Sequence, residues 1–308
     1  MEQVIDVHGH LGDILEPGGG RLIDARGVVM ERIFDPVAVS EARLHRDALG
    51  VGKLSYSLFT GAFTRAERAR NATATLENFR SSLDDAGVTR SVCLPIPPYV
   101  TFEDLRRAAE AEPRVIPFTG VDYSGAGGLD FDFADQVRRG ARGLKLHPII
   151  QNIPLTSPET RAAVESFATH ELPVLFHCGV SSYYLGADRR RQEPRYGEIH
   201  YAAELARDFP AVRFIAGHAG LFEVRKVMAL LGDHPNVWVD TSFQSVGRVK
   251  ELIEVFGCER VLFASDWPFG NRPPALEIVR RACAGDTGAL RRILYENAAE
   301  LLGFPGDG

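Results

Sequence analysis

Two histidines separated by one residue follow a short apolar run at the start of the chain. Residues 1–10 read MEQVIDVHGH, so Gly9 lies between His8 and His10. Side chains of a β-strand alternate between its two faces, and both imidazoles therefore point to the same side. Two imidazoles on one face at the end of a buried strand can bind one metal ion. The pair alone also fits inert loop histidines, so its meaning depends on the rest of the chain.

Ionisable residues end four further apolar runs. These are Lys145 and His147 in Gly-Leu-Lys-Leu-His-Pro, His177 in Val-Leu-Phe-His-Cys-Gly, His218 in Ile-Ala-Gly-His-Ala-Gly and Asp266 in Leu-Phe-Ala-Ser-Asp-Trp-Pro. A buried polar group without a partner costs roughly 1–3 kcal/mol. One such histidine can be satisfied within a core, but five runs with the same ending favour a shared partner. A divalent cation would satisfy several of these side chains at once.

Eight apolar runs alternate with helical patterns along the chain, in the order that a (β/α)8 barrel requires. Because the runs are almost continuously apolar, they are typical of a parallel sheet covered by helices. The predicted strands are residues 4–8, 91–96, 115–121, 143–147, 174–177, 213–218, 237–241 and 261–265. The predicted helices are residues 66–86, 102–111, 133–139, 158–170, 199–208, 222–231, 248–256, 274–284 and 288–302.

Two segments are longer than a barrel connection needs. Residues 11–65 follow the first predicted strand, and residues 179–197 follow the fifth. Barrel active sites are built at the carboxyl ends of the strands, where long loops often form lids or substrate walls. We therefore expect residues 1–308 to form one distorted α/β barrel domain with two loop insertions and its site at that face.

Composition limits the possible functions. The 308 residues are 45% hydrophobic and 25% charged, with a net charge of −6. These values are typical of an ordinary soluble globular protein, and the acidic balance argues against nucleic-acid binding. No long apolar stretch or signal peptide is evident, and the four cysteines show no close pairing. We expect a cytoplasmic protein with free thiols, without membrane or nucleic-acid partners, that can form a homodimer.

As a set, the motifs resemble the amidohydrolase superfamily. The resemblance is to the amidohydrolase-related branch, which includes aminocarboxymuconate-semialdehyde decarboxylase and related metal-dependent decarboxylases, hydratases and hydrolases. It covers the whole barrel but not the two long loops. The matching segments are residues 6–10, 143–148, 175–179, 216–220 and 265–268, together with the closing helical segment 294–303.

The resemblance implies a metal site built from His8, His10, His177 and Asp266. Three nitrogens and one carboxylate suit Zn²⁺ with an open position for water, while Mn²⁺ and Fe²⁺ remain alternatives. Asp266 would also pass protons between water and substrate, and His218 would act beside it as a base or electrostatic stabiliser.

Lys145 has two possible roles. In binuclear relatives a lysine on the fourth strand is carboxylated and bridges two ions, with the strand-five and strand-six histidines on the second ion. The branch resembled here generally uses one ion, which we favour because lysine becomes a ligand only after modification. Lys145 would then be a charge near the substrate, and His147 an outer residue, a substrate contact or a core residue.

Three further residues are candidates for substrate binding. Arg191 and Arg195 lie in segment 179–197, where arginines can bind a carboxylate with two hydrogen bonds. Trp267 follows Asp266 and either shapes the pocket or packs beneath it.

The expected reaction is metal-dependent hydrolysis by activated water. Its substrate would be a small amide, ester or lactone that bears a carboxylate. The first alternative is decarboxylation or hydration of an aromatic or muconate-like acid, which uses the same ligands. The second is a barrel that binds metal without catalysis.

Overall fold

The computed structural model describes residues 2–47, 50–124 and 131–304, and its strands run parallel in two sheets. The first sheet has the order β1-β2-β3 and the second the order β4-β5-β6-β7-β8-β9. The strands are β1 (Ile5–Asp6), β2 (Arg90–Cys93), β3 (Val115–Pro117), β4 (Thr119–Gly120), β5 (Leu144–Leu146), β6 (Val174–Phe176), β7 (Phe214–Ala216), β8 (Val237–Asp240) and β9 (Val261–Leu262). Each of the eight predicted runs holds a strand, and the third is divided between β3 and β4.

Backbone hydrogen bonds close these strands into a ring. The N–H of Val7 donates to the carbonyl of Phe263 at 3.0 Å, and that of Asp266 donates to His8 at 2.8 Å. Gly9 and Trp267 form a parallel bridge beside them. The two sheets meet where β3, the last strand of the first sheet, is followed by β4, the first strand of the second. Only Phe118 separates these two strands. The fold is therefore a distorted (β/α)8 barrel, as the alternating pattern predicts.

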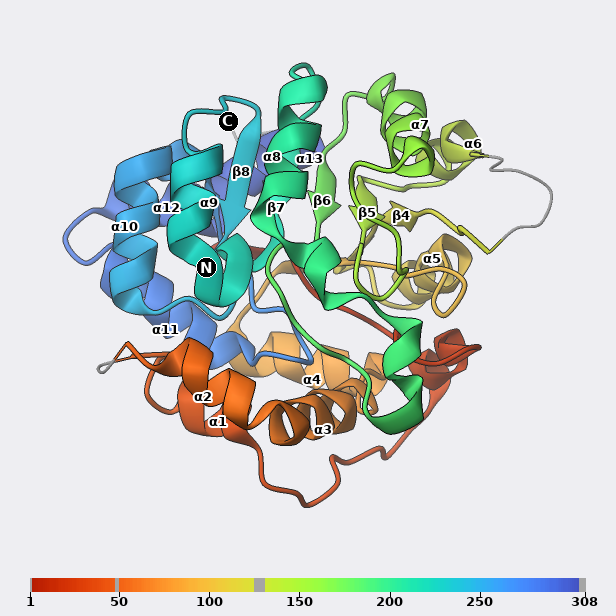
Figure 1. Cartoon of the computed structure of the whole chain (residues 1–308), viewed down its shortest axis with the longest axis horizontal. Coiled ribbons are helices and arrows are strands. Elements are labelled where there is room, and N and C mark those ends of the chain that lie inside the picture. The colour runs from red at the N-terminus through yellow and green to blue at the C-terminus, as the bar shows by residue number, and fades with distance from the viewer. Residues whose placement is uncertain (1, 48–49, 125–130, 305–308) are drawn as a thin grey trace.

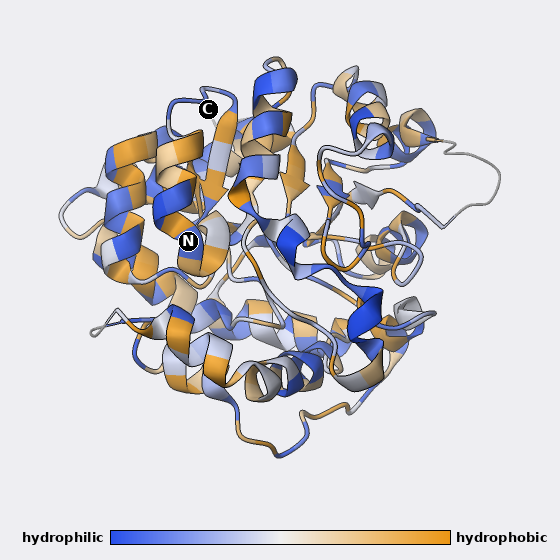
Figure 2. Ribbon diagram, viewed as in Figure 1, coloured by the Kyte–Doolittle hydropathy of each residue, from blue (hydrophilic) through white to orange (hydrophobic). Residues whose placement is uncertain are grey.

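The barrel helices match their predicted segments within a few residues, and Figure 1 shows α8, α9 and α10 packed beside β7 and β8. In Figure 2 these helices carry polar residues on one side and apolar residues on the other. Ser157 caps α7 by accepting from the N–H of Thr160, with Pro158 in the first turn. The helices are α4 (Leu76–Ala86), α5 (Phe102–Ala111), α6 (Phe133–Arg138), α7 (Pro158–Ala168), α8 (Ile199–Asp208), α9 (Val224–Leu231), α10 (Val246–Phe256), α11 (Arg272–Ala282), α12 (Thr287–Arg291) and α13 (Asn297–Leu302), with a π-helical turn (Arg292–Glu296) between the last two.

The sequence-based interpretation of residues 11–86 needs two corrections. The predicted loop 11–65 contains the 3₁₀ turn η1 (Gly19–Asp24), α1 (Pro36–Glu41), α2 (Gly52–Leu58) and the start of α3 (Thr60–Asn71). The predicted helix 66–86 is two helices, because Thr75 accepts from the N–H of Asn78 and starts α4 anew. In Figure 1, α1, α2 and α3 form a separate layer below the barrel strands.

Segment 179–197 reaches this layer and contains two short 3₁₀ turns, η2 (Gly186–Arg191) and η3 (Pro194–Gly197). The Tyr184 hydroxyl donates to the carbonyl of Leu15 at 2.9 Å, and the Thr64 hydroxyl donates to that of Ser182 at 2.9 Å. The two insertions therefore pack on each other instead of forming independent loops.

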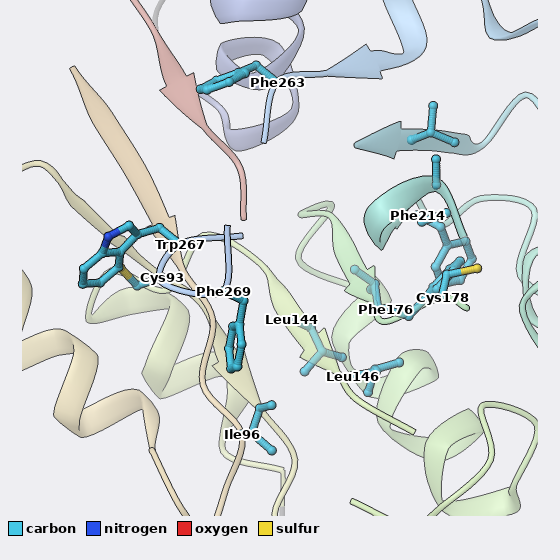
Figure 3. Packing of buried hydrophobic residues seen from close by; sticks show 14 of the residues in the cluster. Cys93, Ile96, Leu144, Leu146, Phe176, Cys178, Phe214, Phe263, Trp267 and Phe269 are labelled. Carbon is cyan, nitrogen blue, oxygen red and sulfur yellow. The ribbon is translucent and has the colours of Figure 1, made fainter. Parts of the chain in front are cut away.

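Strand alternation separates the core from the polar residues at the strand ends. Leu144, Leu146, Phe176 and Cys178 belong to the large hydrophobic cluster that Figure 3 shows in part. The residues between them, Lys145 and His177, therefore project to the opposite face. The register also aligns the neighbouring strands, with Leu146 opposite Phe176 and Phe176 opposite Ala216. The residues that follow these three positions consequently emerge at one edge of the sheet.

Candidate metal centre

Three acceptor atoms converge where the first and last barrel strands meet. The Oδ1 atom of Asp266 lies 3.5 Å from His8 Nε2 and 3.3 Å from His10 Nε2. All three residues are buried. His8 and His10 extend from the end of β1, and Asp266 follows β9, so barrel closure brings them together.

Hydrogen bonds fix the proton on the outer nitrogen of both histidines. His10 Nδ1 lies 2.9 Å from the carbonyl of Leu94, which can only accept. His8 Nδ1 lies 2.8 Å from Asp240 Oδ2. Desolvation lowers the pKa of both imidazoles, that of His10 to about 3, which keeps them neutral at pH 7. Each Nε2 therefore directs a lone pair toward Asp266.

The Asp266 oxygen between these lone pairs is buried, and it has no hydrogen-bond partner in the described part of the chain. Desolvation raises the pKa of Asp266 well above its usual value, and a nearby cation would oppose that shift. Two neutral imidazoles and a carboxylate are ligands that Zn²⁺ prefers. The residues present thus fit a divalent cation. The ligand atoms of His8, His10 and Asp266 also lie close enough to one another to hold one.

A second carboxylate, Asp240 at the end of β8, orients the residues around this cluster. Besides His8, it accepts from the N–H of His218 at 2.9 Å and from the hydroxyl of Ser242 at 2.6 Å. The Ser242 oxygen is in turn 2.8 Å from His218 Nδ1. Asp240 was missing from the candidates, although it is an acid near the end of an apolar strand like the others.

His218 lies in a strained turn, η4 (Gly217–Glu223), after β7. Its φ is 59°, and the next three residues also have positive φ. Such backbone costs an L-residue roughly 1–3 kcal/mol and persists where surrounding bonds over-determine it. Here the Asp240 carboxylate binds the His218 N–H, and Gln244 donates to the His218 carbonyl at 2.7 Å. The turn stacks the His218 ring on that of His8, with centroids 4.5 Å apart.

Replacing Asp240 by asparagine is expected to weaken metal affinity roughly 10–100-fold, the usual effect of losing an outer carboxylate. The amide places one neutral oxygen where a charged group now holds His8 Nδ1 and the His218 backbone. Competition with a chromogenic chelator measures the change. Asp233→Asn, at an exposed position, is the matched control, and equal affinity in both variants would contradict the role of Asp240.

His177 and His147 lie beside the cluster with other partners. His177 Nε2 is 2.8 Å from the carbonyl of Gly179, and its Nδ1 is 3.4 Å from the Tyr183 hydroxyl. The His147 ring stacks on that of His177 with centroids 4.3 Å apart, and the His218 ring lies edge-on to that of His177 with centroids 5.0 Å apart. The structure thus brings His177 to the site but points its nitrogens elsewhere, and its ligand role stays a prediction.

Lys145 is buried at the centre, with Nζ 3.3 Å from His8 Nε2. Desolvation lowers the pKa of its amine to about 8, and the Asp266 and Asp240 carboxylates oppose that shift. An amine with this pKa is partly neutral near pH 7, which carboxylation requires. The position beside His8 fits a charge near the substrate and a bridging ligand alike.

The proposed substrate-binding residues are more scattered. Arg191 donates to Glu16 at 3.3 Å and to the carbonyl of Leu15 at 3.0 Å, so it joins the two insertions. Arg195 is exposed on η3. The indole of Trp267 packs in the core against Phe79, with ring centroids 5.4 Å apart, and points away from Phe269 in Figure 3.

Acid is expected to destabilise the metal-free protein steeply. Desolvation holds the pKa values of five buried histidines below the unfolded value near 6.5, so below that pH the unfolded chain binds more protons. Each contributes about 1.4 kcal/mol per pH unit. Asp266 and Glu67, whose pKa values are raised, offset about two of them. The free energy of unfolding should fall by about 4 kcal/mol from pH 6 to pH 5.

Urea unfolding in the presence of a chelator measures this change at pH 7, 6 and 5. A midpoint that stays constant over this range would contradict the neutral, buried histidines.

Comparison with known proteins gives a consistent picture. The family model described as Amidohydrolase matches residues 5–304. An uncharacterized protein of Sinorhizobium fredii is 37% identical over 92 residues, which cover 24% of this chain and only 31% of that relative. In the described residues, no helix has the length and apolar character needed to span a membrane.

Solved structures share the fold at low sequence identity. An uncharacterized TIM-barrel protein of Bordetella bronchiseptica superimposes with a TM-score of 0.66 at 15% identity, covering 98% of each chain. A probable 2-pyrone-4,6-dicarboxylic acid hydrolase of Acinetobacter baumannii gives 0.59 at 14% identity, over 99% of this chain and 100% of that one. A 5-carboxyvanillate decarboxylase of Sphingomonas paucimobilis gives 0.60 at 16%, with the same coverage.

Proposed function

This chain belongs to the amidohydrolase family, and from that premise we propose that it is a metal-dependent hydrolase of a small organic amide, ester or lactone. The observation that carries the proposal is the buried Asp266 oxygen, which faces two imidazole lone pairs and has no hydrogen-bond partner among the described residues. Like acceptors at 3.3–3.5 Å repel each other unless a proton or cation lies between them. The hydrolase among the solved barrels supports the same reaction class.

His8, His10 and Asp266 would hold the cation, with His177 as the further ligand that the family resemblance implies. Zinc is the ion that this donor set suits best, and one ion is the simpler occupancy. When bound, a divalent cation supplies Lewis acidity that activates water and polarises a substrate oxygen.

The chain's own groups would move the protons. Ser242 donates its hydroxyl hydrogen to Asp240, so its oxygen accepts from His218 Nδ1–H. This leaves His218 Nε2 unprotonated and able to act as the base. Asp266, which the bound cation would keep ionised, would accept a proton from water and pass it to the leaving group, as the family resemblance implies.

The test begins with metal analysis of the purified protein, followed by a hydrolysis screen of lactones, amides and esters that carry a carboxylate. We expect one divalent ion per chain and hydrolysis that a chelator abolishes. His218→Asn should lower kcat roughly 10²–10⁴-fold and leave the metal content unchanged. Protein that takes up no stoichiometric metal under any loading condition would refute the proposal.

Burial of the site favours decarboxylation as a second candidate. His8, His10, Lys145, His177 and His218 are each at most 3% exposed. A carbanion formed by loss of CO₂ would have to take its proton from a site residue instead of bulk water, and Asp266 is suited to give it. Release of CO₂ from hydroxybenzoates and muconates, without lactone or amide hydrolysis, would select this reaction. Metal binding without either activity would select the non-catalytic barrel.

A further inference from the structure

We propose that Glu67 is a specificity-determining residue that accepts a hydrogen bond from a donor group of the substrate, such as a hydroxyl or amino group. The inference rests on the proposed function, because it places the substrate between Glu67 and the metal centre. Glu67 lies on α3, a helix that begins within the insertion 11–65, which the family resemblance does not cover.

The position of Glu67 follows from its neighbours on α3. Thr64, Glu67 and Arg70 are spaced by three residues and share one face of the helix. On that face Thr64 donates to the carbonyl of Ser182 at 2.9 Å, and Arg70 Nη1 donates to that of Phe269 at 2.8 Å. Glu67 therefore lies between the loop that follows β6 and the loop that follows β9.

Both of these loops carry the site. Phe269 packs its ring edge-on against His10, with centroids 5.8 Å apart, and Tyr183 follows Ser182 and faces His177. The charge of Glu67 contributes to the raised pKa values of both Tyr183 and Asp266. Helix α3 thus brings Glu67 to the side of the site that these two loops form.

The carboxyl also lacks the partners that its neighbours have. Glu67 is half-buried, but its Oε2 atom is buried and has no hydrogen-bond partner in the part of the chain that the structure covers. Arg70, whose charge acts to lower the Glu67 pKa, pairs instead with Asp35 at 2.8 Å and Glu41 at 3.0 Å. Desolvation raises the pKa of Glu67 to about 8. A buried acceptor of this kind is costly unless a ligand supplies the missing donor.

The adjacent arginines do not supply the hydrogen-bond donor that Glu67 Oε2 lacks. Arg68 donates to Glu16 at 2.6 Å, and Arg191 binds the same carboxylate. Their guanidinium groups lie against the ring of Tyr184, 5.6 and 4.4 Å from its centroid. These cations therefore serve the contact between the two insertions, and neither hydrogen-bonds to Glu67 Oε2, which leaves that atom able to accept from a substrate.

The test compares matched ligands that differ in one donor. Calorimetry on the zinc-loaded protein measures the Kd of 2-, 3- and 4-hydroxybenzoate against the corresponding fluorobenzoates, in which fluorine cannot donate. At least one hydroxyl isomer should bind roughly tenfold or more tightly than its fluoro partner, because a site built for a donor rejects the analogue that lacks it. Glu67→Leu should remove this difference, and Glu67→Gln, which keeps an acceptor oxygen, should retain part of it.

A merely structural role predicts a different result, because a disturbed fold weakens both members of a pair equally. Glu254→Gln, at an exposed position on α10, is the control that should keep the wild-type preference. A preference that survives in Glu67→Leu would overturn the inference, as would metal-loaded wild-type protein that binds the pairs equally or binds none of the probes. Failure to take up zinc would refute the proposed function instead, so the two failures are distinguishable.

Discussion

Replacing Asp266 by asparagine is expected to stabilise the metal-free protein while it removes metal binding and activity. At pH 7 the unfolded chain carries an ionised Asp266, whereas folding buries this carboxyl next to two imidazole lone pairs. Folding must either bury the charge or take up a proton, and both cost free energy. Asparagine avoids that cost and offers N–H donors to the histidines, a gain of roughly 1–3 kcal/mol.

The sign of the pKa shift gives this prediction a pH dependence. An acid whose pKa is raised in the folded state destabilises the protein above its unfolded pKa near 4. The advantage of the Asp266→Asn variant should therefore grow as the pH rises from 4 and vanish near pH 4. Urea unfolding of chelated protein at several pH values measures it, with the exposed Asp85→Asn variant as control.

Metal and activity should change in the opposite direction. The wild-type protein should gain stability from added zinc according to its affinity, and the variant should not. Loss of a ligand that also transfers protons should lower kcat/KM by about 10³-fold or more. An Asp266→Asn protein that holds one ion per chain and remains active would contradict both roles.

The convergence of the candidate ligands was largely predictable because the strands impose a simple rule. Residues that interrupt apolar runs at their carboxyl ends must emerge at one face of a parallel barrel, and His8, His10, Lys145 and Asp266 all do so. The same rule also predicts Asp240, because this residue ends an apolar strand in the same way. Its absence from the candidate residues was therefore wrong. The nitrogen that each histidine presents depends on distant partners such as Leu94, and no local pattern contains that information.

The layer formed by α1, α2 and α3 was not predictable in the same way. α1 and α2 have only six and seven residues, too short to be stable without tertiary contacts. Arg70 instead ties this region together through Asp35 and Glu41. Arginine is normally exposed, so a sequence pattern gives no reason to place it, or Glu67 one turn earlier, at a buried site.

Replacing Arg272 by methionine is expected to cost about 3–5 kcal/mol of stability, the usual consequence of breaking a buried ion pair. Arg272 and Asp6 are both fully buried, with Arg272 Nε 3.0 Å from Asp6 Oδ2. Methionine fills much of the volume but leaves the Asp6 charge without its cation. Arg280→Met, on the exposed side of the same helix, breaks only a surface pair with Glu2 and should cost less than about 1 kcal/mol.

The same pair positions the metal centre, so the variant should also lose metal affinity. Asp6 accepts from the backbone N–H of His8 at 3.3 Å and from that of Ser265 at 3.0 Å. These residues are a proposed ligand and the neighbour of a proposed ligand, one on each side of the seam where the first and last strands close the barrel. Arg272 adds hydrogen bonds to Ser82 at 2.8 Å and Ser91 at 3.1 Å, which join α4 and β2 to the seam.

A double-mutant cycle separates these two effects. Asp6→Asn in the Arg272→Met background removes the unpaired charge and should recover a substantial part of the lost stability, because most of the cost of a broken buried pair is the charge left behind. Metal affinity should not recover to the same extent. The asparagine oxygen can keep both backbone N–H bonds that Asp6 Oδ1 now accepts, but its amide NH₂ cannot accept from the Ser265 hydroxyl and Arg272 as Asp6 Oδ2 does. Recovery of metal affinity in step with stability would show that Asp6 and Arg272 support the fold in general, and would contradict a specific role in aligning His8 with Asp266.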